Sequence, residues 1–401
     1  MLTRKQYLLS TLLVCFAAST TLAQTSMAEF QQVLREKASF AEQDLAALQL
    51  NQPVVRLVPT SNKREVAVTG LVNINASAED FLRSYRDSML QKSNAAILEI
   101  GRFGPEPALA DLEALSLEAK DIEDLKECVA GDCQVKLSAP MIQRFRNEID
   151  WAAPDYQLRV TNLFKEMLVA YIKDYRARGE AALIEYSDKR DRVSLATEQR
   201  ALSSGGGYIN SFLADTKSDL QLIQETLVWS KIKFGLKPVI SVNHISIYKR
   251  NSDVGPQVLV ASKQIYANHY FNAFHALTAF VNVPGATYLV YENRSRADGL
   301  EGPFGKIKRG VVEKKALEGL RGIIAQSKAS LESPALTAAT AAEFSARSSD
   351  GWGHRLFGGI RPLLWLLVLS AIIALLVLGR RRADSATSAK GKALKPESVK
   401  S

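Results

Sequence analysis

Histidine and cysteine are scarce in this chain, which has four histidines and three cysteines among its 401 residues. Because these residue types supply most zinc ligands, their scarcity gives no indication of a metal or cofactor site. Two motifs typical of hydrolases, Gly-x-Ser-x-Gly and His-Glu-x-x-His, are also missing. We therefore expect no cofactor and no metal, and the sequence favours a protein that is not an enzyme.

Excess positive charge is absent from the middle of the chain, although the formal net charge is +9. Two of the excess charges lie in residues 1–23 and five in residues 380–401, which leaves the long middle region almost neutral. A nearly neutral region has no broad basic surface on which a phosphate backbone could lie. We therefore predict no nucleic-acid partner and assign the basic excess to membrane topology.

The stretch 362–379 has no charged residue and reads PLLWLLVLSAIIALLVLG. As a helix it would be roughly 27 Å long, which suits a hydrocarbon core of about 30 Å. Arg380, Arg381 and Arg382 follow directly, and such a cluster marks the cytoplasmic side of a membrane. The sequence thus predicts one C-terminal transmembrane helix with its C-terminal end in the cytoplasm.

The amino terminus is typical of a secretory signal peptide, which we place at residues 1–23. Arg4 and Lys5 precede an apolar segment, and small residues at its end permit cleavage before Gln24. An uncleaved signal anchor is one alternative. A lipoprotein modified at Cys15 is another, although the residue before this cysteine is not small, as lipidation requires.

Signal and anchor together predict a single-pass protein of the cell membrane. Residues 24–332 would form an extracytoplasmic, periplasmic domain, and residues 333–361 would be a flexible stalk rich in Ala, Ser and Thr. Residues 380–401 would form a basic cytoplasmic tail. The membrane is therefore the one partner that the sequence identifies directly.

Cys128 and Cys133 are the two cysteines of the predicted mature chain, and four residues separate them. In an oxidising compartment this spacing predicts a small disulfide loop, with Gly131 permitting the turn. Such a loop stabilises the fold by roughly 2 kcal/mol. A redox pair usually has two intervening residues and a metal site needs two further ligands, so both alternatives receive less support.

Hydrophobic patterns divide the domain into a mixed beginning, a helical middle over about 100–230, and a β-rich end. Residues 65–75 alternate as a strand, and a helix is expected from Ala78 behind a cap at Asn75 or Ser77. The other main predicted segments are a long helix over 155–202, a helix over 208–229, strands within 238–291 and a long helix over 304–331.

The densest group of polar and aromatic residues is the segment 262–270, within the predicted β region. A metal site would require His244, His269 and His275 to meet on neighbouring strands. An ordinary sheet face with aromatic and polar pairs is the alternative to any active site here. The charge-rich segment 293–298 is expected to form ion pairs and capping contacts. The candidates for acid–base chemistry are Lys263, Tyr266, His269 and Tyr270.

The order of these elements resembles that of the START/polyketide-cyclase-like proteins, which have the helix-grip fold. In that family a strand and a helix come first, a curved antiparallel sheet follows, and a long terminal helix closes the groove. The resemblance implies an α+β fold with an apolar cavity, often for lipids, and no shared catalytic residue. Residues of about 100–230 would be a large, mostly helical insertion, in which this chain departs from the family. The cysteine loop and the segments 262–270 and 288–296 also resemble those of uncharacterised bacterial envelope proteins.

Three functional hypotheses follow. The leading one is a non-enzymatic, membrane-anchored module that binds an apolar, lipid-like ligand or a protein partner. The second is an envelope enzyme that uses the cluster at 263–270, and it requires those side chains to converge in one cleft. The third is a structural or assembly protein of the envelope, which would use the charged helix 155–202 as its contact surface.

Overall fold

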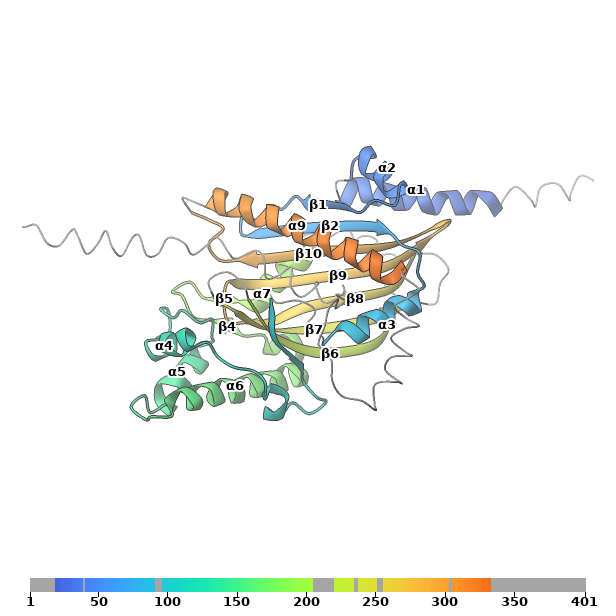
Figure 1. Ribbon diagram of the computed structural model, residues 1–401. Helices are drawn as coiled ribbons and strands as arrows, with labels where there is room; N and C mark the ends of the chain where they lie inside the picture. Colours follow the sequence, from blue (N-terminus) through green and yellow to red (C-terminus); the bar gives the residue numbers. More distant parts are fainter. Residues whose placement is uncertain are drawn as a thin grey trace, which may run out of the picture.

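The computed structural model describes residues 19–38, 40–90, 96–204, 220–233, 237–250, 255–302 and 305–332. They form an α+β fold in which a large antiparallel sheet is covered by helices (Figure 1). Most of the predicted signal peptide and all of the predicted stalk, transmembrane helix and tail lie outside the described residues. Among the helices that are described, none is long and apolar enough to cross a bilayer.

Eight strands of the described chain form one sheet, and each neighbouring pair is antiparallel. The strands β2 and β3 are neighbours in sequence but are separated in the sheet by β6 to β10. From one edge to the other the order is β1 (Val54–Val58), β2 (Glu65–Asn73), β10 (Ala286–Ala297), β9 (Phe271–Val283), β8 (Gly255–Ala267), β7 (Val239–Lys249), β6 (Gln221–Ile232) and β3 (Ile97–Arg102).

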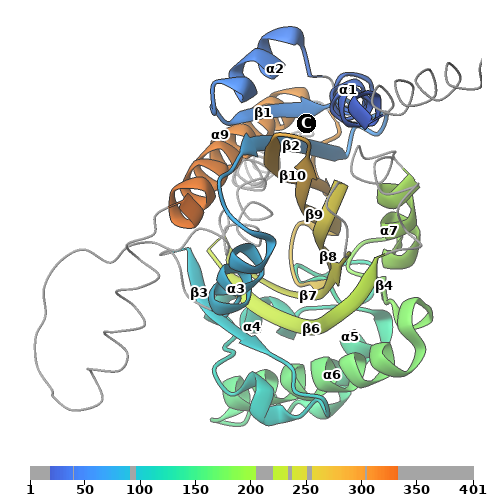
Figure 2. The same cartoon turned by 90° about the vertical axis from the view of Figure 1, so that its right-hand side faces the viewer.

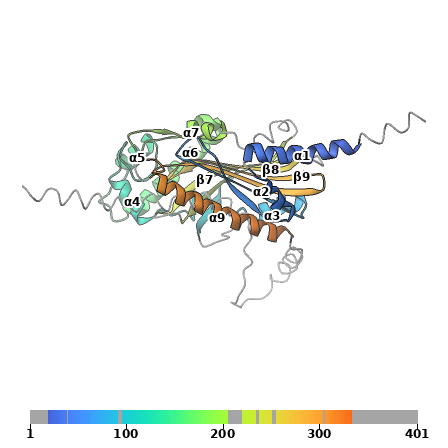
Figure 3. The same ribbon diagram turned by 90° about the horizontal axis from the view of Figure 1, so that it is seen from above.

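The sheet is curved, and its two faces carry different helices (Figure 2). The helices α3 (Ala78–Ser88) and α9 (Gly305–Glu332) lie on the inner side of the curve, which we call the concave face. The opposite, convex face carries α1 (Ser19–Ala38), α2 (Glu42–Gln49), α6 (Tyr156–Arg178) and α7 (Leu195–Ser204). The view from above places α9 on the opposite side of the sheet from α1 and α7 (Figure 3).

The concave core is built from apolar side chains of the sheet, α3 and α9. Ser77 caps α3, because its Oγ accepts a hydrogen bond from the Asp80 N–H at 3.1 Å, as the sequence predicts. Helix α9 approaches β2 so closely that a Cβ added at Gly70 would overlap the Cδ1 of Ile324. This glycine therefore sets how deeply α9 lies against the sheet.

The convex side holds two further cores. One lies beneath α1 and α2 and includes Phe30, Leu34 and Tyr288. The larger one includes Phe164 and Trp229 and joins the sheet to the helical region between β3 and β6. That region contains η1 (Leu109–Leu112), α4 (Ala119–Lys126), α5 (Ala139–Glu148), α6, η2 (Gly179–Ala182), the small hairpin of β4 (Glu185–Tyr186) and β5 (Val193–Ser194), and α7.

The predicted helix over 155–202 is not continuous, so that prediction was wrong. Helix α6 ends at Arg178, and the next residue, Gly179, has a φ of 58°, in the left-handed region that glycine adopts easily. The chain then forms η2 and the β4–β5 hairpin before α7 begins. The charged residues of mixed sign at 188–192 lie in the turn of this hairpin, so their alternating sign does not indicate a helix.

The predicted helix over 208–229 was also wrong from residue 221 onward, since β6 occupies Gln221–Ile232, and its part over 208–219 lies outside the described residues. Val228 and Ile232 pack into the concave core, whereas Leu227 and Trp229 pack into the convex one. A strand buried on both faces has no alternation of apolar and polar residues, so its pattern resembles that of a buried helix. The helical insertion therefore ends before β6 rather than near residue 230.

Gly101 of β3 provides a test of packing at the edge of the sheet. A Cβ at this position would lie 2.6 Å from ring atoms of Trp229, whose Nε1 donates a hydrogen bond to the Asp111 carbonyl at 2.8 Å. Because the buried ring cannot move without losing this bond, we expect Gly101→Ala to lower the free energy of unfolding by about 1–3 kcal/mol. Urea unfolding followed by circular dichroism measures this loss.

The matched control is Gly310→Ala in α9. This glycine is exposed, and a Cβ there would meet no heavy atom within 4 Å among the described residues. Alanine is the better helix former, so we expect this variant to gain up to about 1 kcal/mol. A Gly101→Ala variant as stable as wild type would contradict the close contact with Trp229.

Candidate functional site

The four predicted acid–base residues lie in β8 and in the turn between β8 and β9, but they do not point into one cleft. The Lys263 Nζ lies 2.7 Å from the Glu180 Oε1 on the convex side. The Tyr266 hydroxyl is fully buried and donates a hydrogen bond to the Lys136 carbonyl at 3.1 Å. His269 and Tyr270 alone remain together, with ring centroids 5.7 Å apart.

His269 takes part in a buried polar contact between the β8–β9 turn and α4. Its Nε2 lies 2.9 Å from the Asp121 Oδ2, and the Lys237 Nζ lies 2.9 Å from the Asp121 Oδ1. Burial by itself raises the pKa of Asp121, but the hydrogen bond from His269 and the charge of Lys237 outweigh it and lower this pKa below its usual value. A carboxylate held in this way can orient the imidazole.

The side chains of His269 and Asp121 are both buried in the protein. His269 is 3 % exposed and Asp121 is 1 % exposed, so neither reaches solvent. Tyr270 adopts a φ of 59° and its hydroxyl accepts a hydrogen bond from the Lys237 N–H at 3.2 Å. The arrangement therefore fixes the turn onto α4.

The other two predicted metal candidates lie elsewhere in the fold. The His244 Nε2 lies 3.2 Å from the Glu225 Oε1, and its Nδ1 lies 2.9 Å from the Tyr175 hydroxyl. His275 faces α7, where its Nδ1 lies 3.4 Å from the Ser203 hydroxyl. Throughout the described residues, no group of three or more His, Cys, Asp or Glu side chains could hold a metal ion.

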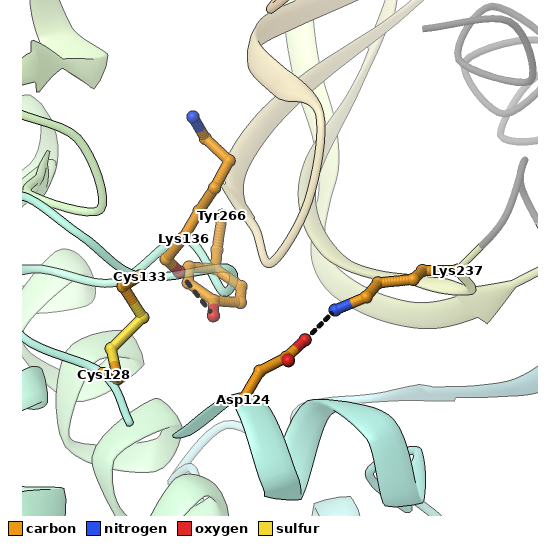
Figure 4. Close-up of a disulfide and its surroundings, with 6 residues drawn as sticks. All are labelled: Asp124, Cys128, Cys133, Lys136, Lys237 and Tyr266. Atoms are coloured by element: carbon orange, nitrogen blue, oxygen red, sulfur yellow. Dashed lines mark hydrogen bonds and ion pairs between the residues drawn. A yellow bond between two sulfur atoms is a disulfide. The ribbon is translucent and has the colours of Figure 1, made fainter. Parts of the chain in front are cut away.

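A disulfide joins Cys128 to Cys133, as the sequence predicts, with a Cα–Cα distance of 4.6 Å. Figure 4 shows the disulfide near Lys136 and Tyr266, with the ion pair of Asp124 and Lys237 on the other side. A polar cavity of about 430 Å³ adjoins it. The residues lining this cavity are mainly charged and come from α4, the cysteine loop, the residues next to them and the start of α6: Lys120, Glu123, Asp124, Lys126, Glu127, Asp132, Cys133, Gln134 and Tyr156.

Removing the disulfide tests its structural role. We expect the double variant Cys128→Ala, Cys133→Ala to lose roughly 2 kcal/mol of stability, because the short loop is no longer closed in the unfolded chain. The measurement is urea unfolding of the oxidised wild type and the variant. The matched control is wild type in reductant, which should lose about as much. Labelling of two free thiols in the native wild-type protein would contradict the disulfide.

The charge-rich segment 293–298 forms ion pairs, as expected from the sequence. Arg294 and Arg296 point to the convex face, where both contact the buried carboxylate of Glu65 at 2.8 and 3.2 Å. Arg296 also contacts Glu198 of α7 at 3.2 Å. These groups bind one another rather than an outside anion, and they hold α7 against the sheet.

The concave face carries a patch that the sequence analysis did not identify, and we call it the concave patch. Its members share three properties: they are buried, they are polar, and they carry no charge. They extend across the centre of the sheet from β6 to β10. They are Ser230, Ser241, Asn243, Ser262, Gln264, Asn293 and Ser295.

Strand register places these residues on the face of α3 and α9. Ser262 lies opposite Ile245 of β7, and Asn293 lies opposite Val68 of β2; both apolar partners belong to the concave core. Side chains directly opposite in an antiparallel pair point to the same face. The residues next to them in sequence, such as Lys263, point to the convex face instead.

Several atoms of the concave patch are buried without a hydrogen-bond partner among the described residues. They comprise three amide oxygens and two hydroxyls: Asn243 Oδ1, Gln264 Oε1, Asn293 Oδ1, Ser262 Oγ and Ser295 Oγ. An unpaired buried polar atom costs about 1–3 kcal/mol, so native proteins contain few of them. Each unpaired atom in a native structure calls for an explanation, such as an ordered water, an ion or a functional role.

A period-two pattern of Asn, Gln and Ser in predicted strands is the sequence signal that could have revealed the concave patch. Asn293 and Ser295, Ser262 and Gln264, and Ser241 and Asn243 are each two residues apart.

No protein-family model, curated protein or solved structure matches this chain.

Proposed function

We propose that this protein is a membrane-anchored, extracytoplasmic binding module that holds a lipid-like ligand between the concave face of its sheet and the helices α3 and α9. The single observation that carries the proposal is the concave patch, with five buried polar atoms that have no hydrogen-bond partner in the described part of the chain. An apolar core around a polar centre suits a ligand that has both kinds of surface. No catalytic step is part of this function.

The strand order supports a helix-grip-like arrangement. Strand β2 lies beside the last strand, β10, while β3 lies at the far edge beside β6. The long helix α9 then crosses β1 and β2 on the concave side, with α3 next to it (Figure 2). In the helix-grip proteins that this chain resembles, the groove between terminal helix and sheet is where ligands lie. Strand β1 and the helices between β3 and β6 would be additions to that arrangement.

An enzyme acting through His269 receives less support. Lys263, Tyr266 and His269 have different partners, Glu180, the Lys136 carbonyl and Asp121, so they do not converge in one cleft. A structural protein that uses a helix over 155–202 also receives less support, because α6 ends at Arg178. A binding function is therefore the hypothesis that the geometry favours.

Mass spectrometry of the full-length protein tests the proposal. The chain is transferred from its native membrane into an amphipathic polymer, without detergent exchange, and is analysed under native conditions. We expect a bound small molecule in wild type. The variant Ala276→Leu should lose it, because Ala276 lies between Asn293 and Ser262 in the register and a larger side chain would fill the centre of the patch.

The matched control is Ala46→Leu on the exposed side of α2, which should keep the bound mass. Thermal unfolding of both variants shows whether they fold. If the face is already tightly packed, Ala276→Leu destabilises the protein by about 1–3 kcal/mol through overpacking. Wild type without any bound molecule, together with such destabilisation, would overturn the binding function.

A further inference from the structure

The concave patch has no charged member, although charged residues are frequent on the same strands. Lys263 on β8 and Arg294 on β10 are direct neighbours of patch residues in sequence. Both point to the convex face, where Lys263 contacts Glu180 and Arg294 contacts Glu65. The strands therefore separate their side chains by charge, with ion pairs on one face and neutral polar groups on the other.

The unpartnered atoms of the patch are mainly hydrogen-bond acceptors. The Asn243 Nδ2 donates to the Ser241 hydroxyl at 3.3 Å, and the Asn293 Nδ2 donates to the Tyr291 hydroxyl at 3.3 Å. Among the described residues, no donor reaches their carbonyl oxygens or the Gln264 Oε1, and each of these oxygens can accept a hydrogen bond. The hydroxyls of Ser262 and Ser295 can both donate and accept.

The surroundings of the patch are apolar. On the sheet, Ala276 lies between Ser262 and Asn293, and Phe274 lies opposite Ser295. The facing helices contribute Phe81 from α3 and Leu320 from α9 to the same core. A charged ligand group placed here would lose its contact with water and gain no counter-charge from the patch, which is energetically costly. A neutral hydroxyl would instead form hydrogen bonds with the patch.

We propose that the ligand is an amphiphile with an uncharged head group that bears hydroxyls, as in a glycerol- or sugar-headed lipid. This inference rests on the proposed function. The hydroxyls of the head group would donate to the amide oxygens of Asn243, Gln264 and Asn293 and exchange hydrogen bonds with Ser262 and Ser295. The acyl chain would lie against the apolar side chains of α3 and α9.

Four probes with the same oleoyl chain test the head group. Glyceryl mono-oleate has a neutral head with two hydroxyls, methyl oleate has no hydroxyl, oleate has a carboxylate, and oleoyl lysophosphatidate has a phosphate. Each is titrated into the full-length protein in the amphipathic polymer, and the dissociation constant is measured by native mass spectrometry. We expect glyceryl mono-oleate to bind at least about tenfold more tightly than the other three.

The double variant Ser262→Ala, Ser295→Ala tests the contact itself. Both hydroxyls are buried without a partner among the described residues, so their removal should leave the unliganded melting temperature unchanged or higher. Affinity for glyceryl mono-oleate should fall about tenfold, to the level of methyl oleate. The control Ser88→Ala removes a buried hydroxyl that already donates to the Ser84 carbonyl at 2.7 Å, and it should leave the affinity unchanged.

The outcomes separate the two claims. Binding of none of the four probes would overturn this inference, and an additional absence of a native bound molecule would overturn the proposed function. Oleate or lysophosphatidate binding as tightly as glyceryl mono-oleate would overturn only the uncharged head group. Binding of methyl oleate as tight as that of glyceryl mono-oleate would show that the concave patch does not contact the head group, and it would overturn the inference. A lower unliganded melting temperature of the double variant would assign the two hydroxyls to the fold and also overturn the inference.

Discussion

Replacing Glu65 by leucine is expected to lower the free energy of unfolding by about 3–5 kcal/mol, because it leaves buried positive charge without its partner. The Glu65 side chain is 4 % exposed and contacts Arg294 at 2.8 Å and Arg296 at 3.2 Å. Arg294 keeps Glu292 and Arg296 keeps Glu198 as remaining partners. The guanidinium groups of Arg294 and Arg296 would nevertheless lose one of the carboxylates that neutralise them in a buried site of low dielectric constant. Urea unfolding followed by circular dichroism measures the loss.

The control for this prediction is Glu42→Ala. Glu42 pairs with Arg35 at 2.6 Å, but its side chain is 78 % exposed, so water can replace the partner. We expect no measurable change in that variant. A Glu65→Leu variant with a loss below about 1 kcal/mol would show that solvent reaches the cluster, as at an ordinary surface pair.

Replacing Lys136 by methionine is expected to have a comparable effect at neutral pH, about 3–5 kcal/mol. The Lys136 ammonium is buried and lies 3.3 Å from Asp298, 3.8 Å from Asp188 and 2.9 Å from the Asn272 Oδ1. Methionine keeps the shape of the side chain but removes the charge. Two carboxylates would then lie close together with Lys189 as their remaining cation.

The pH dependence of this loss follows from Asp298. Burial by itself raises the pKa of Asp298, but the charges of Lys136 and Lys189 outweigh it and lower the pKa to about 2. The folded-state pKa thus lies below the unfolded value of about 3.9, so the stabilisation is complete above that value and is lost as the pH falls toward 2. We expect the difference between wild type and Lys136→Met to be largest near neutral pH and to shrink in acid.

The control is Lys189→Met, which removes a second cation from the same carboxylate. The Lys189 side chain is 46 % exposed, so its removal should cost clearly less than that of Lys136. Equal losses for the two lysine variants, or a Lys136→Met loss that does not change between pH 7 and acid, would contradict the buried charge cluster.

Local signals in the sequence predicted much of the fold. The cap at Ser77, the strand over 65–75 and the disulfide each depend on residues whose pattern is complete within a few positions. The boundaries of the long C-terminal helix were likewise close, since α9 spans Gly305–Glu332. These features needed no knowledge of distant contacts.

Features that depend on burial on both faces could not be predicted in this way. Strand β6 has apolar residues on consecutive positions because Val228 packs inward and Trp229 packs outward, and only the neighbouring strands make that possible. The divergence of Lys263 and His269 has a similar cause. Lys263 lies within β8 and points to the convex face. His269 lies in the turn after β8 and forms a hydrogen bond with Asp121 of α4, more than a hundred residues earlier in the chain.

The position of β2 has a consequence for how the chain reaches its native state. Val68 of β2 pairs with Asn293 of β10, so one neighbour of β2 in the sheet comes from a segment more than two hundred residues later in the chain. Contacts of such long range form slowly, because a large loop must close before they can form. Because β10 ends at Ala297, nearly all of the described residues are synthesised before the sheet can be completed. Until β10 has been synthesised, β2 can pair only with β1, its neighbour in the sequence.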